Sequence, residues 1–199
     1  MGTDGADTQS DGGTARTLVA GAGNDTLTAT AASVLYGGAG NDTFNIDSTM
    51  LAALQNPMGS GGNLDRLARI DGGSGTDKIV LSGGGLTFDL TLVANQAASN
   101  PDGGSRIDSV EKFDITGSGN NILKLTAKDV LELGSAKLFT TTALRQQLLV
   151  MGNAGDTVDV DTGWSRSGAA ATIESVSYNV WNHTGDLATL YVQQGVLVM

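Results

Sequence analysis

A short word rich in glycine and aspartate recurs between residues 2 and 80, and it constrains the fold more than any other feature. Its three best copies are Gly21–Leu27, Gly38–Phe44 and Gly73–Ile79, and a weaker copy, Gly2–Asp7, opens the chain. In each of the three, two glycines two positions apart precede an aspartate, and a large apolar residue follows two positions after that aspartate. Glycine permits a turn with positive φ, and the apolar residue then lies in a short strand that faces a core.

The spacing of the aspartates predicts stacked rounds of chain. Asp7 and Asp25 lie 18 positions apart, Asp25 and Asp42 lie 17 apart, and Asp42 and Asp77 lie 35 apart. Two nonapeptide repeats form one coil of a parallel β-roll. The sequence therefore predicts a mainly β fold, namely a calcium-binding parallel β-roll or solenoid-like domain with short helical and loop insertions.

The same word predicts metal binding. Turn carbonyls and an aspartate carboxylate supply the hard oxygen ligands that Ca²⁺ prefers, and a neighbouring round supplies the remaining ligands. The alternative is a set of plain glycine–aspartate turns in a β protein, and three near-identical copies favour calcium, with several ions bound. The candidate metal-binding residues are Asp7, Gly21, Gly23, Asp25, Gly38, Gly40, Asp42, Gly73, Gly75 and Asp77, and a shifted variant of the word adds Asp156.

Composition and net charge limit the classes of molecule that this chain is expected to bind. The 199 residues fit one domain and carry a net charge of −10, which disfavours nucleic acid and anionic membranes as partners. Of the 21 acidic residues 18 are aspartate and 3 glutamate, which is typical of turns and cation sites rather than helix faces. There is no cysteine, so disulfides and thiolate metal sites are excluded. The sequence contains no run of 18 apolar residues, so we expect no membrane insertion.

We expect a single domain over residues 1–199. Residues 1–46 and 70–82 carry the calcium repeats, residues 47–69 and 94–106 form two insertions, and residues 107–199 continue the β core. Short helices are predicted from Ser48 to Gln55 and from the capping box at Thr126 to Gly134, while Leu138–Gln147 stays open. Strands are expected at 79–81, 88–92, 113–115, 122–125, 178–181, 188–192 and 196–198. In Gly117–Leu123 Asn121 replaces the aspartate, so we expect hydrogen bonds to close that turn.

Enzyme motifs are weak, and we expect no catalytic activity. Asp161-Thr162-Gly163 spells the triplet of aspartic proteases, which need a second copy, and the chain has one. His183 is the single histidine, there is no cysteine nucleophile, and no G-x-S-x-G elbow is present. An exposed turn residue is the expected role of His183.

The nonapeptides resemble those of RTX (repeats-in-toxin) proteins, which are secreted by bacteria. The segments Gly104–Gly117, Asp129–Leu133 and Gly152–Val158 are similar to a domain near the C-terminal end of giant bacterial RTX adhesins. The resemblance covers about residues 17–199 and extends to the peptide-binding module of ice-binding and biofilm-forming adhesins. It implies a calcium-dependent module at the bacterial cell surface, exported by type I secretion and excised from a longer adhesin chain, for cell adhesion and biofilm formation.

In that module, the resemblance implies, a calcium ion helps to hold the free C-terminal carboxylate of a target peptide on another cell. A −10 protein would repel such an anion without a bridging cation. The candidate ligand-binding residues are Asn100, Asp102, Asp108 and Asp114, with Arg106 as a carboxylate clamp. Arg106 in an internal salt bridge, and Asp108 and Asp114 as turn residues, are the structural alternatives. A spacer without a ligand and a calcium-dependent lectin, with Trp164, Tyr178, Trp181 and Tyr191 as a sugar platform, remain alternative functions.

Overall fold

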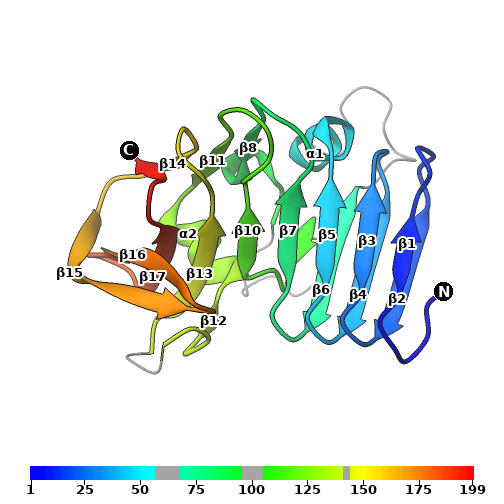
Figure 1. Ribbon diagram of the computed structural model, residues 1–199, viewed down its shortest axis with the longest axis horizontal. Coiled ribbons are helices and arrows are strands. Elements are labelled where there is room, and N and C mark those ends of the chain that lie inside the picture. The colour runs from blue at the N-terminus through cyan, green and yellow to red at the C-terminus, as the bar shows by residue number, and fades with distance from the viewer. Residues whose placement is uncertain (57–67, 96–104, 141–143) are drawn as a thin grey trace.

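The computed structural model describes residues 1–56, 68–95, 105–140 and 144–199. The chain is mainly β, with 47% strand and 10% helix, and its sheets are largely parallel. This confirms the mainly β prediction. In Figure 1 the long sheet runs across the molecule from β1, near the N-terminus, to β15 at the opposite end.

Three sheets make up the fold. The largest has the order β1 (Thr8–Ser10), β3 (Thr26–Ala29), β5 (Thr43–Ile46), β7 (Lys78–Leu81), β10 (Lys112–Asp114), β13 (Gln146–Met151), β17 (Ala188–Gln193), β16 (Val176–His183) and β15 (Trp164–Ile173), with β12 (Ser135–Ala136) beside β13. A second sheet has the order β2 (Thr17–Ala22), β4 (Val34–Ala39), β6 (Arg69–Ser74) and β9 (Ile107–Asp108). The third has the order β18 (Leu197–Val198), β14 (Thr157–Val160), β11 (Ile122–Leu125) and β8 (Thr87–Asp89).

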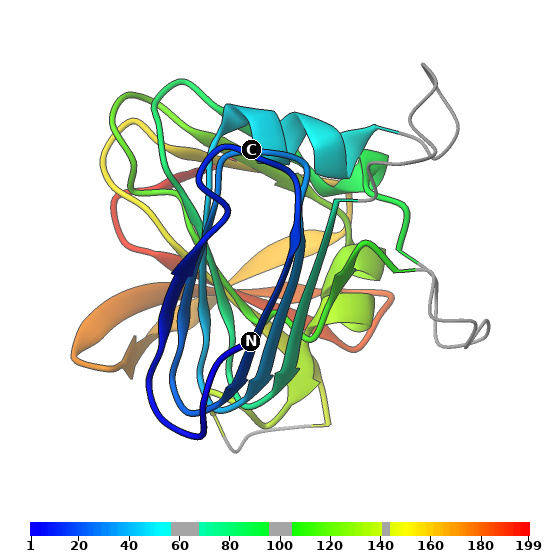
Figure 2. The same ribbon diagram turned by 90° about the vertical axis from the view of Figure 1, so that its right-hand side faces the viewer.

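Successive strands of the first rounds alternate between the two facing sheets. The chain passes from β2 to β3, from β4 to β5 and from β6 to β7, and each strand pairs in parallel with its equivalent one round later. Leu27, Phe44 and Ile79 occupy one register position and are fully buried. Figure 2, which looks along the row of strands, shows these two sheets facing each other, with α1 across one end of them. The apolar residue of each repeat therefore fills the space between the sheets, as expected.

After β7 each round gains a strand in the third sheet. The round that begins at β7 passes through β8 and β9 and returns to the long sheet at β10. Asp77 and Glu111, which begin successive rounds there, lie 34 positions apart, close to the 35 positions between Asp42 and Asp77. The expected strand at 88–92 is wrong in its second half, because Asp89 caps a 3-10 turn over Leu90–Leu92 (η2). Strands β13, β14 and β15 were not predicted. Apolar and polar residues alternate poorly in β13 and β15, whereas β14 (Thr-Val-Asp-Val) alternates and could have been found.

Both predicted helices are confirmed. Helix α1 (Ser48–Gln55) begins at Asp47, whose carboxylate accepts the Thr49 and Met50 N–H groups. Helix α2 (Ala127–Leu133) begins with the capping box of Thr126 and Asp129 and ends at Gly134. The open segment from Leu138 enters strand β13 at Gln146. No helix among the described residues has the length and apolar character needed to cross a membrane.

The C-terminal end departs from the parallel pattern. Strands β15, β16 and β17 pair antiparallel, and they form a second apolar cluster with β13 on one face of the long sheet. The cluster contains Leu149, Ile173, Tyr178 and Tyr191. The two tyrosines are buried, whereas Trp164 and Trp181 are partly buried against the main core.

Asp11, which the sequence analysis did not single out, clamps two successive rounds together. Its buried carboxylate accepts the N–H groups of Gly13, Thr30 and Ala31 and the hydroxyl of Ser33. Burial alone would raise the pKa of Asp11, but these hydrogen bonds outweigh it and hold the pKa below the usual value.

Replacing Asp11 with alanine should destabilise the protein by about 3 kcal/mol, because several buried donors lose their acceptor together. Chemical denaturation near neutral pH measures the change. Asp4→Ala, at an exposed position near the same end of the stack, is the matched control and should leave stability almost unchanged. Equal losses from the two substitutions would contradict the clamp.

Candidate metal centre

The repeat aspartates form a ladder along one edge of the stack. Asp25 Oδ1 accepts the Asp7 N–H at 2.7 Å, Asp42 Oδ1 accepts the Asp25 N–H at 2.8 Å, and Asp77 Oδ1 accepts the Asp42 N–H at 2.7 Å. Each carboxylate thus reaches back to the backbone of the preceding round. The structure therefore brings together the four aspartates that the repeats predicted.

The second carboxylate oxygen of three of these residues has no partner. Oδ2 of Asp25, Asp42 and Asp77 is buried and accepts no hydrogen bond from any described residue. An unpaired buried carboxylate oxygen is costly, because it has lost its water without gaining a donor. Three such atoms in register are the structural feature that most favours a candidate cation site.

Main-chain carbonyl oxygens of the next round converge on the same places. A Cβ placed on Gly72 would lie 2.5 Å from Asp77 Oδ2 and 1.9 Å from Ser109 O. A Cβ placed on Gly37 would lie 2.2 Å from Asp42 Oδ2 and 2.6 Å from Gly72 O. A carboxylate oxygen and a carbonyl oxygen thus face one point at both glycines. Such an all-oxygen set suits Ca²⁺.

A cation at the ladder would need backbone carbonyls among its ligands, because no group of three or more His, Cys, Asp or Glu side chains gathers for a metal in the described part of the chain. The repeat glycines let the carbonyls approach. They have positive φ, and a Cβ on any of them would collide with the backbone of the preceding round: Gly21, Gly23, Gly38, Gly40, Gly73 and Gly75.

Substituting Gly38 with alanine should destabilise the fold by about 3 kcal/mol or more, because φ is +115° and the new Cβ would lie 1.9 Å from Gly21 O. Gly12→Ala is the matched control, since Gly12 also has positive φ but no atom lies within 4 Å of its Cβ position. We expect a loss of about 1 kcal/mol there from backbone strain alone. Thermal unfolding of both variants in calcium would test the difference, and equal losses would argue against close packing of the turns.

Electrostatics in the ladder oppose its ionised form. Burial raises the pKa of Asp77 to about 7, and the charges of Asp42 and Glu111 add to that shift. Burial also raises the pKa of Asp42, with a contribution from the Asp25 charge. A cation among these carboxylates would favour their ionised forms and reverse both effects.

Glu111, which is not among the residues predicted from the repeats, closes the ladder at its C-terminal end. Its Oε2 accepts the Asp77 N–H at 3.0 Å, and its Oε1 accepts the Ser135 hydroxyl at 3.2 Å. Burial raises its pKa. Asp71 and Asp108 stand in register on β6 and β9, but Asp77 follows six positions after Asp71, whereas Glu111 follows only three positions after Asp108. The turn before Glu111 is therefore shorter, and the longer glutamate side chain reaches the backbone N–H that an aspartate reaches in the other rounds. Its position 34 residues after Asp77 is the signal that could have revealed it.

The remaining repeat-like turns are closed by hydrogen bonds. Asp156 Oδ1 accepts the Asn121 N–H, and its Oδ2 accepts the Asn153 N–H. Both oxygens are therefore used, unlike those of Asp42 and Asp77. Asn121 in turn accepts the Leu86 N–H and donates to Ile115 O, as the sequence predicted for that turn. At the other end of the ladder, Asp7 Oδ2 accepts the N–H and hydroxyl of Thr3.

The predicted ligand-binding residues do not form one site in the described structure. Arg106 is buried and donates to Ala53 O and Leu54 O near the end of α1, and it forms no ion pair with any residue that the structure describes. Asp114 accepts the N–H and hydroxyl of Thr116 as a turn residue. Asp108 is exposed on β9, in a different sheet. Asn100 and Asp102 lie outside the described residues.

The enzyme-like residues have local partners. Asp161 Oδ1 accepts the indole N–H of Trp164 and the Ala127 N–H. His183 lies at the end of β16, and its Nδ1 is 3.0 Å from Asp186 Oδ2. His183 is a largely buried residue at the end of a strand, so the expected exposed turn position is wrong.

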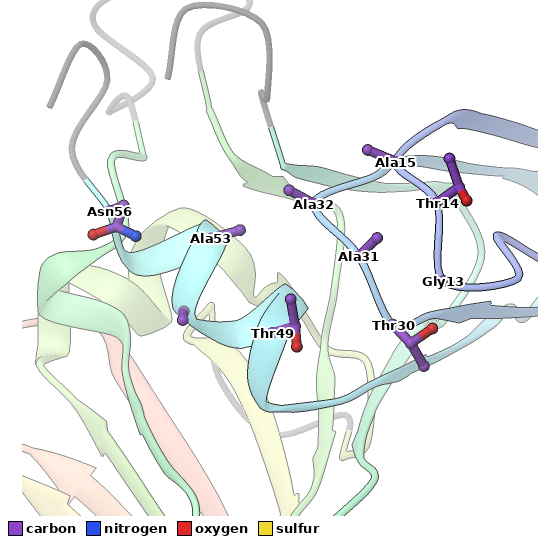
Figure 3. A pocket seen from close by; sticks show the side chains of 10 residues that line it. Gly13, Thr14, Ala15, Thr30, Ala31, Ala32, Thr49, Ala53 and Asn56 are labelled. Atoms are coloured by element: carbon purple, nitrogen blue, oxygen red, sulfur yellow. The ribbon is translucent and has the colours of Figure 1, made fainter. Parts of the chain in front are cut away.

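One pocket, of about 520 Å³, lies where the turns after β1 and β3 meet α1. Figure 3 shows its wall, which is made of small, uncharged residues such as Thr14, Thr30, Ala31, Thr49 and Asn56. It offers neither a carboxylate nor a cationic group, so we assign it no ligand.

No protein-family model, curated protein or solved structure matches the chain. The interpretation of the ladder therefore rests on the residues and their geometry.

Proposed function

We propose that the chain is a calcium-binding parallel β-roll that serves as the ligand-binding module of a bacterial surface adhesin of the RTX type. The observation that carries the calcium part is the row of buried, unpartnered Oδ2 atoms on Asp25, Asp42 and Asp77. Alternation of strands between two parallel sheets, with one aspartate turn per round, supports the roll.

In this proposal each ion lies between two successive turns. Asp25, Asp42 and Asp77 would each contribute the free oxygen, and glycine or serine carbonyls of the next round would complete the shell. Calcium would supply the positive charge that lets the acidic turns pack. Extracellular calcium modules need only modest affinity, which fits sites built largely from carbonyls.

The ligand in this proposal is the free C-terminal carboxylate end of a protein on another cell, held for adhesion and biofilm formation. Support comes from the sequence resemblance and from charge, since a −10 surface accepts an anion only where cations neutralise it. The domain would then act at the bacterial cell surface, where calcium is present.

A library of peptides with free C-termini tests the proposal when binding is measured in calcium, after amidation of the same peptides, and in chelator. We expect binding that disappears on amidation and in chelator. A folded, calcium-loaded protein that binds no peptide in the library would overturn the ligand assignment. Binding to a glycan array instead would favour a lectin.

A further inference from the structure

A small cleft lies between the aspartate ladder and the hairpin of β15 and β16. Its volume is about 230 Å³, and its wall includes Asn41, Thr43, Thr76, Lys78, Lys112 and Glu174. Residues far apart in the sequence thus meet beside the candidate metal centre. Two of the protein's 11 basic residues are among them.

The two lysines stand directly opposite each other on neighbouring strands. Lys78 on β7 pairs in register with Lys112 on β10, and like charges in such a position repel each other. Lys112 Nζ is neutralised by Glu174 Oε1 at 2.6 Å. The ammonium of Lys78 has no hydrogen bond or ion pair with any residue that the structure describes. The cleft therefore contains two carboxylates, those of Asp42 and Glu174, but only Glu174 forms an ion pair with one of the two lysines.

Glu174 shows which chemistry the cleft accepts. It comes from the tip of the β15–β16 hairpin, where Glu174 and Ser175 both have positive φ, at 51° and 67°. Non-glycine residues adopt this conformation at a cost, so the contact with Lys112 helps to hold the tip. The Glu174 side chain is 69% exposed, and that of Lys112 is 13% exposed. The exposed carboxylate of Glu174 thus already binds one of the two lysines, Lys112.

Neutral donors complete the cleft. Asn41 Oδ1 accepts the Thr76 N–H at 2.8 Å, and the Asn41 NH₂ donates to no residue that the structure describes, so it can donate to a ligand. Thr43 stands in register with Lys78 on the adjacent strand and adds a hydroxyl. An anion with two oxygens would therefore meet an ammonium group and several neutral donors.

We propose that this cleft binds a carboxylate group of a peptide ligand, with Lys78 as its main contact and Lys112 shared with Glu174. The inference rests on the proposed function in one respect, because Asp42 also lines the cleft and would repel the ligand unless a cation neutralises it. Calcium in the ladder should therefore strengthen carboxylate binding. The carboxylate could come from a chain terminus or from an acidic side chain, and the chemistry of recognition is the same.

The test follows the lysine side-chain NMR signals of the calcium-loaded protein during titration with three peptides. They are acetyl-Gly-Ser-Gly with a free C-terminus, its C-terminal amide, and acetyl-Asp-Ser-Gly-amide. We expect the Lys78 and Lys112 signals to move with the first and third peptides but not with the second. Movement with the first alone would support the site and assign it to a terminal carboxylate, and movement with the third alone would assign it to an acidic side chain.

Three variants make the test specific to the cleft. Lys78→Met should weaken binding about tenfold through loss of a charged hydrogen bond, and Glu174→Gln should strengthen it by freeing Lys112. Lys128→Met is the control, since Lys128 is exposed on α2 and pairs with Glu132. Lys78→Met binding as tightly as the parent, or Lys78 signals moving no more than those of Lys128, would overturn the cleft assignment.

Failure of the inference and failure of the proposed function can be told apart. Melting curves with calcium and with chelator report on the ladder independently of any peptide. Stabilisation by calcium with no response at Lys78 would refute the cleft and leave the metal sites standing. A response at Lys78 without stabilisation by calcium would support the cleft, refute the metal sites, and show that the Asp42 charge does not exclude a carboxylate.

Discussion

Removal of calcium should lower the melting temperature of the protein by about 20 °C. A site saturated at about 100 times its Kd adds about 2.7 kcal/mol to stability, so three sites would add about 8 kcal/mol. For a chain of this size, about 2–4 °C accompanies each kcal/mol. Differential scanning calorimetry in calcium and in excess chelator measures the shift.

Two comparisons assign this shift to the ladder. Asp42→Asn should remove a large part of the calcium effect, since Asp42 supplies one of the free buried oxygens and an amide is a poorer ligand. Asp108→Asn, at an exposed aspartate on β9, should leave the effect intact. A melting temperature that does not respond to chelator would refute the metal sites and the calcium-binding β-roll with them.

Without calcium, the protein should become more stable as the pH falls from 8 toward 5. The pKa of Asp77 is about 7 in the folded protein, against 3.8 for an aspartate in an unfolded chain. A raised carboxyl pKa contributes stability that is complete below the unfolded value and is lost as the pH rises through the folded value. The full shift corresponds to about 4 kcal/mol for Asp77, of which about 2.7 kcal/mol falls between pH 5 and pH 7, and the raised pKa of Glu111 acts in the same direction.

Urea unfolding of the calcium-free protein between pH 5 and pH 8 tests this expectation. Asp77→Asn should flatten most of the dependence, because asparagine does not titrate. With calcium bound, the order should reverse, since protons then compete with the ion for the same oxygens. A calcium-free protein whose stability increases from pH 5 to pH 8 would show that the ladder carboxylates are not held as the structure places them.

Much of the fold could be predicted because the repeat word encodes both a turn and a strand. The positions of Asp25, Asp42 and Asp77 give the length of each round, and the apolar residue two positions later identifies the buried face. The two helices were equally predictable, since Asp47 and Thr126 are strong capping residues. Local chemistry determines all of these features.

Contacts between distant segments explain what the sequence did not reveal. Glu111 takes the place of an aspartate after a shortened turn, where its longer side chain accepts the Asp77 N–H. Asp11 accepts hydrogen bonds from residues that lie 19 to 22 positions later in the sequence. The role of Arg106 depends on the end of α1, more than 50 residues earlier. The cleft lined by Lys78 and Glu174 forms only where the antiparallel hairpin of β15 and β16 packs beside the ladder, and no repeat in the sequence predicts that hairpin.

The aspartate ladder also has a polarity, because every carboxylate accepts the backbone N–H of the round before it. One end is anchored, since Glu111 is buried and held by Ser135. The other end is open at β1, which among the described strands pairs only with β3. A stack with one anchored end behaves like a zipper and should fray from its open end inward. Amide hydrogen exchange should therefore be fastest in β1 and β2 and slow progressively toward β10, and formation of each ion site should secure the round that precedes it.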